Sequence, residues 1–216
     1  MIRKDNSPSP PMPYSNESTN RIYEMLFCDN AELFRPDIKF LDSYPWNILF
    51  SEIYDTDGLK KIIADSNAES RIKILACNKL LSEEIKPEKK ELLGVVIEIG
   101  LKEGLDVLAA YKDGTARYIN YTEKMIFWES PAEVSNKIID DLFRESEIVL
   151  KQIGPWDKQR LQSPATDNVR ISFLVSDGLY FGQGGIDVFF NDQRSAPVLK
   201  CGSELMNFLI DSSLKK

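Results

Sequence analysis

Four short segments between residues 91 and 129 constrain the fold most. They read ELLGVVIEIGL, LDVLAAY, TARYINY and KMIFWE, are rich in β-branched and aromatic residues, and are separated by turn signals a few residues long. Connections this short cannot hold a crossover helix, so consecutive strands must run antiparallel. These segments therefore predict a four-stranded antiparallel meander.

The dipeptide Asp113-Gly114 is the strongest turn signal in this region and is typical of a two-residue type I′ hairpin. Such a hairpin places Lys112 opposite Thr115, so that Tyr111 and Tyr118 lie on one face of the sheet. Both faces are then largely apolar or aromatic. We therefore expect both faces to be at least partly covered.

A long helix is predicted after the meander. Ser130-Pro131-Ala132-Glu133 is a capping-box sequence, and the helical periodicity that follows ends at Gly154-Pro155. Next come a strand VRISFLVS, the glycine-rich segment SDGLYFGQGG, a strand IDVFF and a helix from about Ser195 to Asp211. Residues 91–216 are thus predicted to form an α+β core in which a meander, a long helix, a β-hairpin and a C-terminal helix follow one another.

The chain before residue 91 is predicted to have two parts. Residues 1–16 are rich in Pro and Ser and lack the apolar run of a signal peptide, which predicts a disordered tail. Residues 17–90 show helical periodicity near 17–30, near 57–65 and after the capping sequence at 66–69. This predicts a helical N-terminal segment packed on the core.

Composition excludes several function classes. The chain has no histidine, which removes the commonest general base near neutral pH, every Ser-His or Cys-His pair and the commonest metal ligand. Cys28, Cys77 and Cys201 have no zinc-like spacing, so we expect three free thiols, a reducing cytoplasm, no metal and no cofactor. A net charge of −7 argues against nucleic acid or anionic membrane as partner, and the apolar runs are too short to cross a bilayer.

The segment SDGLYFGQGG raises the question of a nucleotide site. A dinucleotide fingerprint needs a helix after its glycines, because the helix N-terminus holds the pyrophosphate. The predicted strand IDVFF follows instead, and no Walker lysine is present. The segment is therefore interpreted as a strand connector that holds Tyr180 and Phe181 between glycines as candidate contact residues.

Four further residues are candidate contact positions. Trp156 and Arg160 lie in the locally basic loop 154–168 and either anchor that loop on the core or contact a partner, since Trp and Arg are enriched at interface hot spots. Arg117 and Tyr118 lie in a predicted strand and belong either to the sheet core or to a ligand-facing wall.

The segments LFCDN, AESRIKILA, GLDVLAAYKDGTARYIN, IGPW and FLVSDGLYFGQG resemble a family of uncharacterised bacterial proteins. The resemblance spans residues 23 to 209. It implies a bacterial cytosolic setting and transfers no activity and no site residue. At fold level alone, the order of elements is also loosely similar to that of acidic α+β secretion chaperones.

These observations favour a non-enzymatic cytosolic binding or adaptor protein. It would contact a protein partner through the sheet surface and loops 154–168 and 176–185. A homodimer is a further alternative. The alternative is a small-molecule enzyme that works without histidine, and nucleotide binding at the glycines is a third hypothesis. The enzyme candidates are residues that interrupt apolar strands, namely Glu98, Asp106, Arg117, Tyr118 and Asp187.

Overall fold

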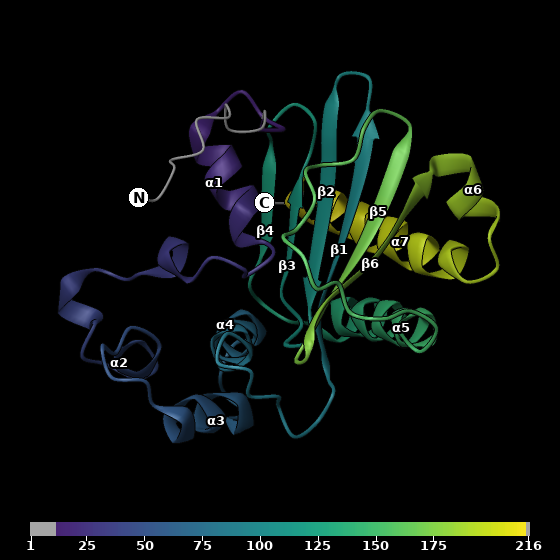
Figure 1. Ribbon diagram of the computed structural model, residues 1–216. Helices are drawn as coiled ribbons and strands as arrows, with labels where there is room; N and C mark the ends of the chain where they lie inside the picture. Colours follow the sequence, from purple (N-terminus) through teal and green to yellow (C-terminus); the bar gives the residue numbers. More distant parts are fainter. Residues whose placement is uncertain (1–11, 215–216) are drawn as a thin grey trace, which may run out of the picture.

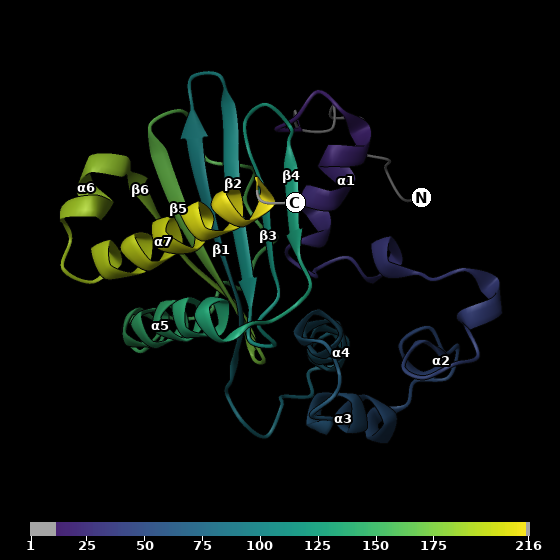
Figure 2. The same cartoon turned by 180° about the vertical axis from the view of Figure 1, so that it is seen from behind.

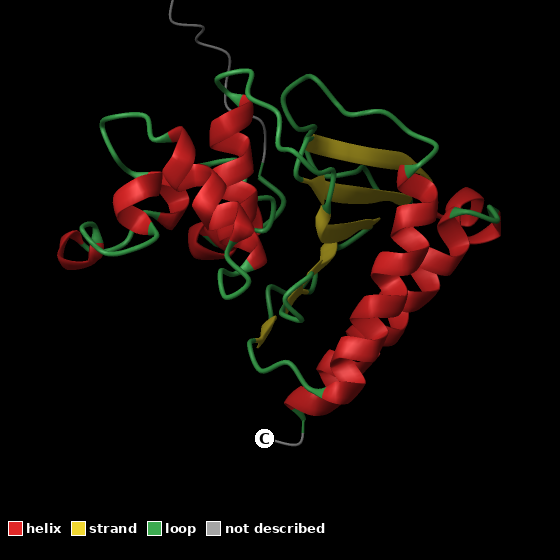
Figure 3. Cartoon of the chain, turned by 90° about the horizontal axis from the view of Figure 1, so that it is seen from below, coloured by secondary structure: helices red, strands yellow, loops and turns green. Residues whose placement is uncertain are grey.

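The computed structural model describes residues 12–214, and its centre is a six-stranded antiparallel sheet. Figure 1 shows the strands side by side, and Figure 3 shows helices on both faces of the sheet. The strands are β1 (Leu92–Leu101), β2 (Gly104–Tyr111), β3 (Ala116–Ile119), β4 (Met125–Trp128), β5 (Asn168–Val175) and β6 (Gly178–Gly185). They lie in the order β4-β3-β2-β1-β5-β6.

The predicted α+β class with an antiparallel sheet is confirmed, but a four-stranded sheet is too narrow. The meander β1 to β4 leaves the far edge of β1 free, and β5 pairs with that edge in a register that joins Val95 to Phe173 and Ile97 to Ile171. β6 then pairs with β5. Strand β1 is buried along most of its length because it lies inside the sheet with helices over both faces.

Helices from the two halves of the chain cover different faces of the sheet, as Figure 2 shows from behind. The first face is covered by α1 (Glu17–Met25) and α4 (Ser70–Leu81). Helices α2 (Trp46–Leu49) and α3 (Thr56–Ala64) pack on α4, and the 3-10 turns Ala31–Phe34 and Ile38–Phe40 lie at the periphery. The second face is covered by α5 (Glu133–Leu150), α6 (Ile186–Asn191) and α7 (Ser195–Ser213).

Two apolar cores result, one on each face. The first contains Tyr23, Leu59 and Tyr111, all nearly inaccessible to solvent. The second contains Leu142 and Leu205, which are fully buried. Full burial of one such side chain contributes about 1.5–3 kcal/mol, so the two cores hold the helical layers on the sheet.

The predicted register of the β2–β3 hairpin is wrong by one residue. Ala110 pairs with Ala116, and the Tyr111 N–H donates to the Thr115 carbonyl at 2.9 Å, so the loop has three residues. Gly114 adopts a positive φ of 83° in this loop. Because a shift of one residue moves every side chain to the other face, Tyr118 lies on the second face and Tyr111 on the first.

The segment predicted as the strand IDVFF is helix α6, and the glycine-rich segment is itself strand β6. The hairpin turn is Ser176-Asp177, and Gly178, the first residue of β6, has a φ of 133°. Phe189 of α6 packs on the glycines of β6, since a Cβ at Gly184 would lie 2.7 Å from the Phe189 ring. Glycine has no side chain with which to show the alternation of a strand, so the sequence pattern did not reveal β6.

Part of the predicted tail is folded onto the sheet. The Tyr14 hydroxyl donates to the Leu105 carbonyl at 3.1 Å, and the backbone N–H groups of Ser15 and Asn16 donate to the Glu123 carboxylate. The rest of that prediction, residues 1–11, lies outside the described residues.

Candidate functional site

A strap of residues 154–167 joins α5 to β5 and crosses the first face between the sheet and α1 (Figure 1). It is paired to the sheet near both of its ends. The Trp156 N–H donates to the Leu179 carbonyl at 2.7 Å, and the Asp167 N–H donates to the Gly100 carbonyl at 2.9 Å. A Cβ at Gly100 would lie 2.2 Å from the Ala165 carbonyl oxygen, so glycine there lets the strap approach β1 closely.

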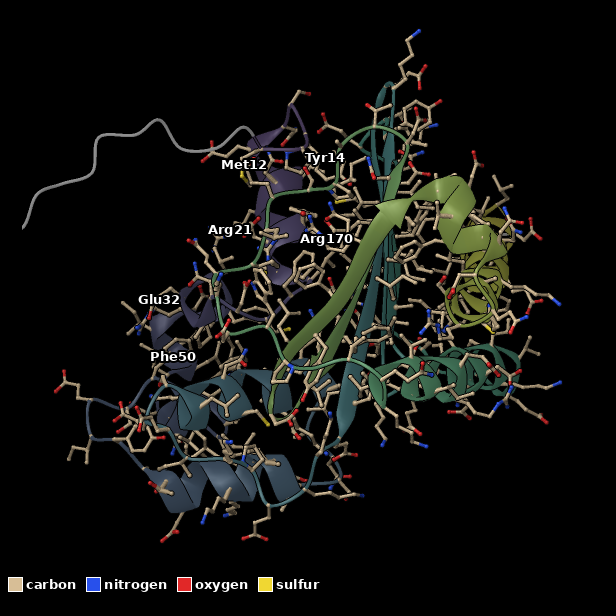
Figure 4. The ribbon with its side chains drawn as sticks, turned by 45° about the vertical axis from the view of Figure 1, so that its right-hand side comes forward. Met12, Tyr14, Arg21, Glu32, Phe50 and Arg170 are labelled. Atoms are coloured by element: carbon tan, nitrogen blue, oxygen red, sulfur yellow. The ribbon has the colours of Figure 1, made fainter. Side chains whose placement is uncertain are left out.

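Arg170 of β5 holds the middle of the strap on the sheet. Its side chain is 2% exposed and rises from β5 between the sheet and α1 (Figure 4). The guanidinium donates to the carbonyls of Leu161, at 3.1 Å, and Gln162, and Nε donates to Gln183 Oε1 at 2.8 Å. The guanidinium thus holds two carbonyls of a segment that has no secondary structure of its own.

Glu98 of β1 neutralises Arg170. The Glu98 carboxylate is completely buried, lies 3.3 Å from Arg170 Nη1 and accepts a 2.7 Å hydrogen bond from the Tyr23 hydroxyl of α1. Burial raises the pKa of Glu98, and the charge of Arg170 only partly opposes that shift. A buried ion pair is a weak source of stability, so we interpret this one as a device that fixes the position of the strap.

Arg160 ties the strap to α1. Its Nη2 lies 2.5 Å from the Glu24 carboxylate and its Nε 2.7 Å from Asp29. The guanidinium also stacks 3.9 Å from the centre of the Phe27 ring. With its side chain 11% exposed and all of these contacts made, Arg160 acts as a clamp and leaves little surface for a partner.

A cleft of about 760 Å³ lies between the strap and α1. Its lining mixes apolar groups with amide, hydroxyl and charged groups, including Met12, Tyr23, Asn30, Lys158, Leu161 and Ser163. Ligand sites commonly enclose about 300–1,000 Å³. The cleft is therefore large enough for a small molecule or for a few residues of a peptide.

Trp156 and Phe181 pack together beside the strap. Their ring centroids are 5.1 Å apart in an edge-to-face arrangement, and both side chains are half-buried. The Trp156 indole N–H donates to the Gln159 carbonyl at 3.0 Å, and the Lys158 ammonium lies 5.6 Å from the Trp156 ring. Of the six predicted contact residues, Trp156, Arg160 and Phe181 are thus brought together at the strap.

Tyr180 and Tyr118 lie on the second face, away from the strap. Tyr180 is buried, accepts a hydrogen bond from Lys90 at 2.9 Å and donates to Asp177 at 3.0 Å. The Tyr118 hydroxyl donates to Asp106 at 2.9 Å beside a cavity of about 40 Å³. That volume is on the scale of one or two water molecules and is too small for a substrate.

Arg117 makes its contacts near the β4 edge of the sheet. Its side chain is 3% exposed, pairs with Glu129 at 2.5 Å and donates to the Ala116 carbonyl at 2.8 Å. This sixth predicted contact residue therefore stabilises the pairing of β3 with β4.

The candidates for an enzyme do not converge. Glu98 is buried under the strap, Asp187 is exposed on α6, and Asp106 and Tyr118 form a pair on the other face of the sheet.

Helices cover both faces, so the sheet surface proposed for a partner is largely occupied by the chain itself. A helix does follow the glycines, against expectation, but Phe189 fills the space over Gly182 and Gly184 where a phosphate cradle would lie.

Sequence reasoning missed the residues that position the strap. Glu24 and Asp29 lie more than a hundred residues before Arg160, which they contact only in the fold, and Arg170 likewise reaches Glu98 only in the fold. The one local signal was Arg170 within the apolar strand NVRISFLV, since a charged side chain buried in a strand must have a partner.

Comparisons with models of protein families, with curated proteins and with solved structures found no match to this chain. Among residues 12–214, no helix is both long and apolar enough to cross a membrane. The same residues contain no group of three or more Cys, Asp or Glu side chains that is placed to hold a metal ion.

Proposed function

We propose that this protein is a non-enzymatic binding protein that takes up an extended peptide segment of a partner protein in the cleft between α1 and the strap. The observation that carries the proposal is the double fixation of the strap, by Arg170 to the sheet and by Arg160 to α1. A wall that is already ordered loses little conformational entropy when a partner binds, which favours affinity.

The lining of the cleft suits a peptide. Asn30, Gln159 and Ser163 offer amide and hydroxyl groups to a main chain, and Leu161 offers apolar surface. The Lys158 ammonium at the cleft favours an acidic residue in the bound segment. Catalysis is disfavoured because Arg160 already binds Glu24 and Asp29, the two carboxylates that line the cleft.

A reducing, cytoplasmic compartment fits the three free cysteines. Cys28 and Cys77 are buried, and burial raises the pKa of Cys77 to about 12, which keeps its thiol protonated and unreactive.

A peptide-display selection on the full chain tests the proposal. Random peptides are selected on the immobilised protein, and the affinity of the enriched peptides is then measured for Lys158→Glu and Leu161→Asp. Leu161 is 39% exposed, so its substitution leaves the core intact. The matched controls are Lys137→Glu and Ile148→Asp on α5, where Lys137 is exposed and Ile148 is 47% exposed.

We expect the two cleft variants to weaken binding about tenfold or more, which corresponds to about 1.4 kcal/mol or more of binding free energy, and the controls to retain it. The proposal fails if no peptide is enriched, or if the selected peptides bind the cleft variants and the wild type equally well.

A further inference from the structure

Strand β6 forms one edge of the sheet. The order β4-β3-β2-β1-β5-β6 gives it a neighbouring strand, β5, on one side, and Figure 4 shows β6 in front of the other strands. Among residues 12–214, the one other backbone contact along β6 is a single antiparallel bridge between Leu179 and Trp156 of the strap. An edge strand presents backbone N–H and C=O groups to which a further strand can pair.

The register of β5 with β6 fixes which of these groups point outward. It has no bulge, so alternate residues of β6 bond to β5 and the others point away. The Leu179 carbonyl points away, since it accepts the Trp156 N–H. Phe181 and Gln183 lie two and four residues further along, so their N–H and C=O groups point to the same side. Within residues 12–214, these four groups have no hydrogen-bond partner.

The outer part of β6, residues 181–185, lacks the features that usually protect the edge of a sheet. It reads FGQGG, with no charged residue and no proline. The Gln183 side chain is held on the first face, where it accepts from Arg170 at 2.8 Å. Natural edge strands are commonly protected by charges, proline or short length. The opposite edge is of that kind, because β4 has four residues and lies between Lys124 and Glu129.

Gly185 at the end of this edge is not explained by the fold. A Cβ at Gly184 would lie 2.7 Å from the Phe189 ring, so packing requires glycine there. A Cβ at Gly185 would meet only Val188, at 3.8 Å, and the φ of Gly185 is −61°, which any residue adopts. Glycine in a strand often marks a place where another backbone approaches closely. Gly185 therefore indicates an approach to the outer side of β6.

Trp156 and α6 select against a second copy of this chain as the added strand. Two β6 strands related by a two-fold axis run antiparallel, so full pairing of residues 181–185 places Gly185 of one copy opposite Phe181 of the other. Helix α6 begins at the next residue, Ile186, and would meet Trp156 of the other copy beside Leu179. Each chain also carries a net charge of −7. The edge thus fits a strand that is not followed by such a helix.

We propose that the outer edge of β6, from Phe181 to Gly185, binds an extended strand of a partner protein through main-chain hydrogen bonds. Side chains on the first face of that strand lie beside Phe181, whose ring packs on Trp156 with a centroid distance of 5.1 Å. An aromatic or β-branched residue is favoured at that position. Together with the strap cleft, this edge makes the chain an adaptor with two contact sites.

Proline substitution at outward-pointing residues tests the proposal. Gln183→Pro and Gly185→Pro each remove an N–H that points away from β5, so the pairing of β5 with β6 is retained. Gly185 already has the φ that proline requires. The matched controls are Gln183→Ala and Gly185→Ala, which change the same side chains and keep the N–H groups.

Linear octapeptides rich in Val, Ile, Thr and Tyr are selected on the immobilised full chain. The affinity of the enriched peptides for each variant is then measured by fluorescence anisotropy. We expect each proline variant to bind about tenfold or more weakly than the alanine variant at the same position. Lys158→Glu should leave this affinity unchanged, because Lys158 belongs to the strap cleft.

Amide hydrogen exchange gives a second readout. The N–H groups of Phe181 and Gln183 should exchange rapidly without peptide, whereas those of Tyr180 and Gly182, which bond to β5, should exchange slowly. Saturating peptide should protect Phe181 and Gln183, which a ligand of the strap cleft would not do.

Five results would overturn the proposal. They are the absence of any enriched octapeptide, equal affinity of the proline and alanine variants, and unchanged exchange of Phe181 and Gln183 at saturating peptide. The fourth is loss of binding in Lys158→Glu with normal binding in the proline variants, which would assign the peptides to the strap cleft. The fifth is a concentration-dependent dimer in sedimentation experiments that Gly185→Pro abolishes, because the edge would then bind a second copy.

Discussion

Glu98 has no exposed surface, although it lies in the central strand of a protein with abundant surface for carboxylates. Its partners come from β5 and α1, namely Arg170 and Tyr23, and both contacts stabilise the ionised carboxylate. Burial nevertheless raises the pKa of Glu98 above the ordinary value of 4.5. Ionisation of Glu98 is thus less favourable in the folded protein than in the unfolded chain.

Glu98→Gln tests this interpretation through pH. With a raised folded-state pKa, the contribution of Glu98 to stability is complete below pH 4.5 and is lost as the pH rises through the folded-state pKa. Gln cannot ionise, so the free energy of unfolding of the variant relative to wild type should increase as the pH rises from about 4 to about 8. Urea unfolding of both proteins across that range measures the difference. Parallel curves would show that the pKa of Glu98 is unshifted.

At the scale of elements, the start of α4 shows why a local pattern was insufficient. The sequence 66–69 predicts the helix start, yet α4 begins at Ser70, and Glu69 at its N-cap position makes no side-chain cap. Asp113 of the β2–β3 loop supplies the cap, since its carboxylate accepts from the Ser70 N–H at 2.6 Å while Ser70 Oγ accepts from the Asp113 N–H. The same contacts explain the three-residue loop, because Asp113 also accepts from the Thr115 N–H.

Asp113→Ala should therefore lower the free energy of unfolding by about 1–3 kcal/mol, because one carboxylate satisfies donors in two elements. Burial alone would raise the pKa of Asp113, but hydrogen bonds from Thr115 and Ser70 outweigh burial and hold it below its usual 3.8. The stability that Asp113 provides is thus present above pH 3.8 and lost as the pH falls. Urea unfolding at neutral and acid pH checks both effects, and an Ala variant as stable as wild type at neutral pH would refute the cap.

Gly202 in the middle of α7 weakens the helix by itself, and it lies against the end of the Ile97 side chain. A Cβ at this position would lie 2.5 Å from Ile97 Cδ1, so glycine lets α7 pack closely on β1. Gly202→Ala should lower the free energy of unfolding by about 1 kcal/mol or less, because the cost of displacing the end of the Ile97 side chain is set against the roughly 1 kcal/mol by which Ala favours helices. Thermal unfolding compares it with Gly154→Ala, where a Cβ meets nothing within 4 Å. A stabilised Gly202→Ala would contradict the close packing.

At the scale of the whole molecule, contacts between residues close in sequence could be predicted, and contacts between residues far apart in sequence could not. Short turns predict the meander β1 to β4 from neighbouring residues alone. The pairing of β5 with β1 joins residues that are more than seventy positions apart, such as Val95 and Phe173, and no local pattern reports it. The residue types of Trp156 and Arg160 made them candidate contact residues. Their roles depend on partners distant in sequence, since Trp156 packs on Phe181. Arg160 pairs with Glu24 and Asp29.

Because helices cover both faces of the sheet, the proposed contact surface differs from the one that the sequence favours. The sequence favours contact through sheet surface, whereas the described chain places α1 to α4 on one face and α5 to α7 on the other. The main surface that we propose for a partner is therefore the cleft between the strap and α1. This cleft is built where irregular chain packs against a helix, and binding residues are commonly found on such segments.

Amide hydrogen exchange with and without a peptide selected on the full chain tests the central claim most directly. If the peptide occupies the cleft, amides of the strap between residues 156 and 163 and of α1 should gain protection, while those of α5 should not change. Protection confined to α5 or to α7, or no change in the strap at saturating peptide, would contradict the assignment of the cleft as the binding site.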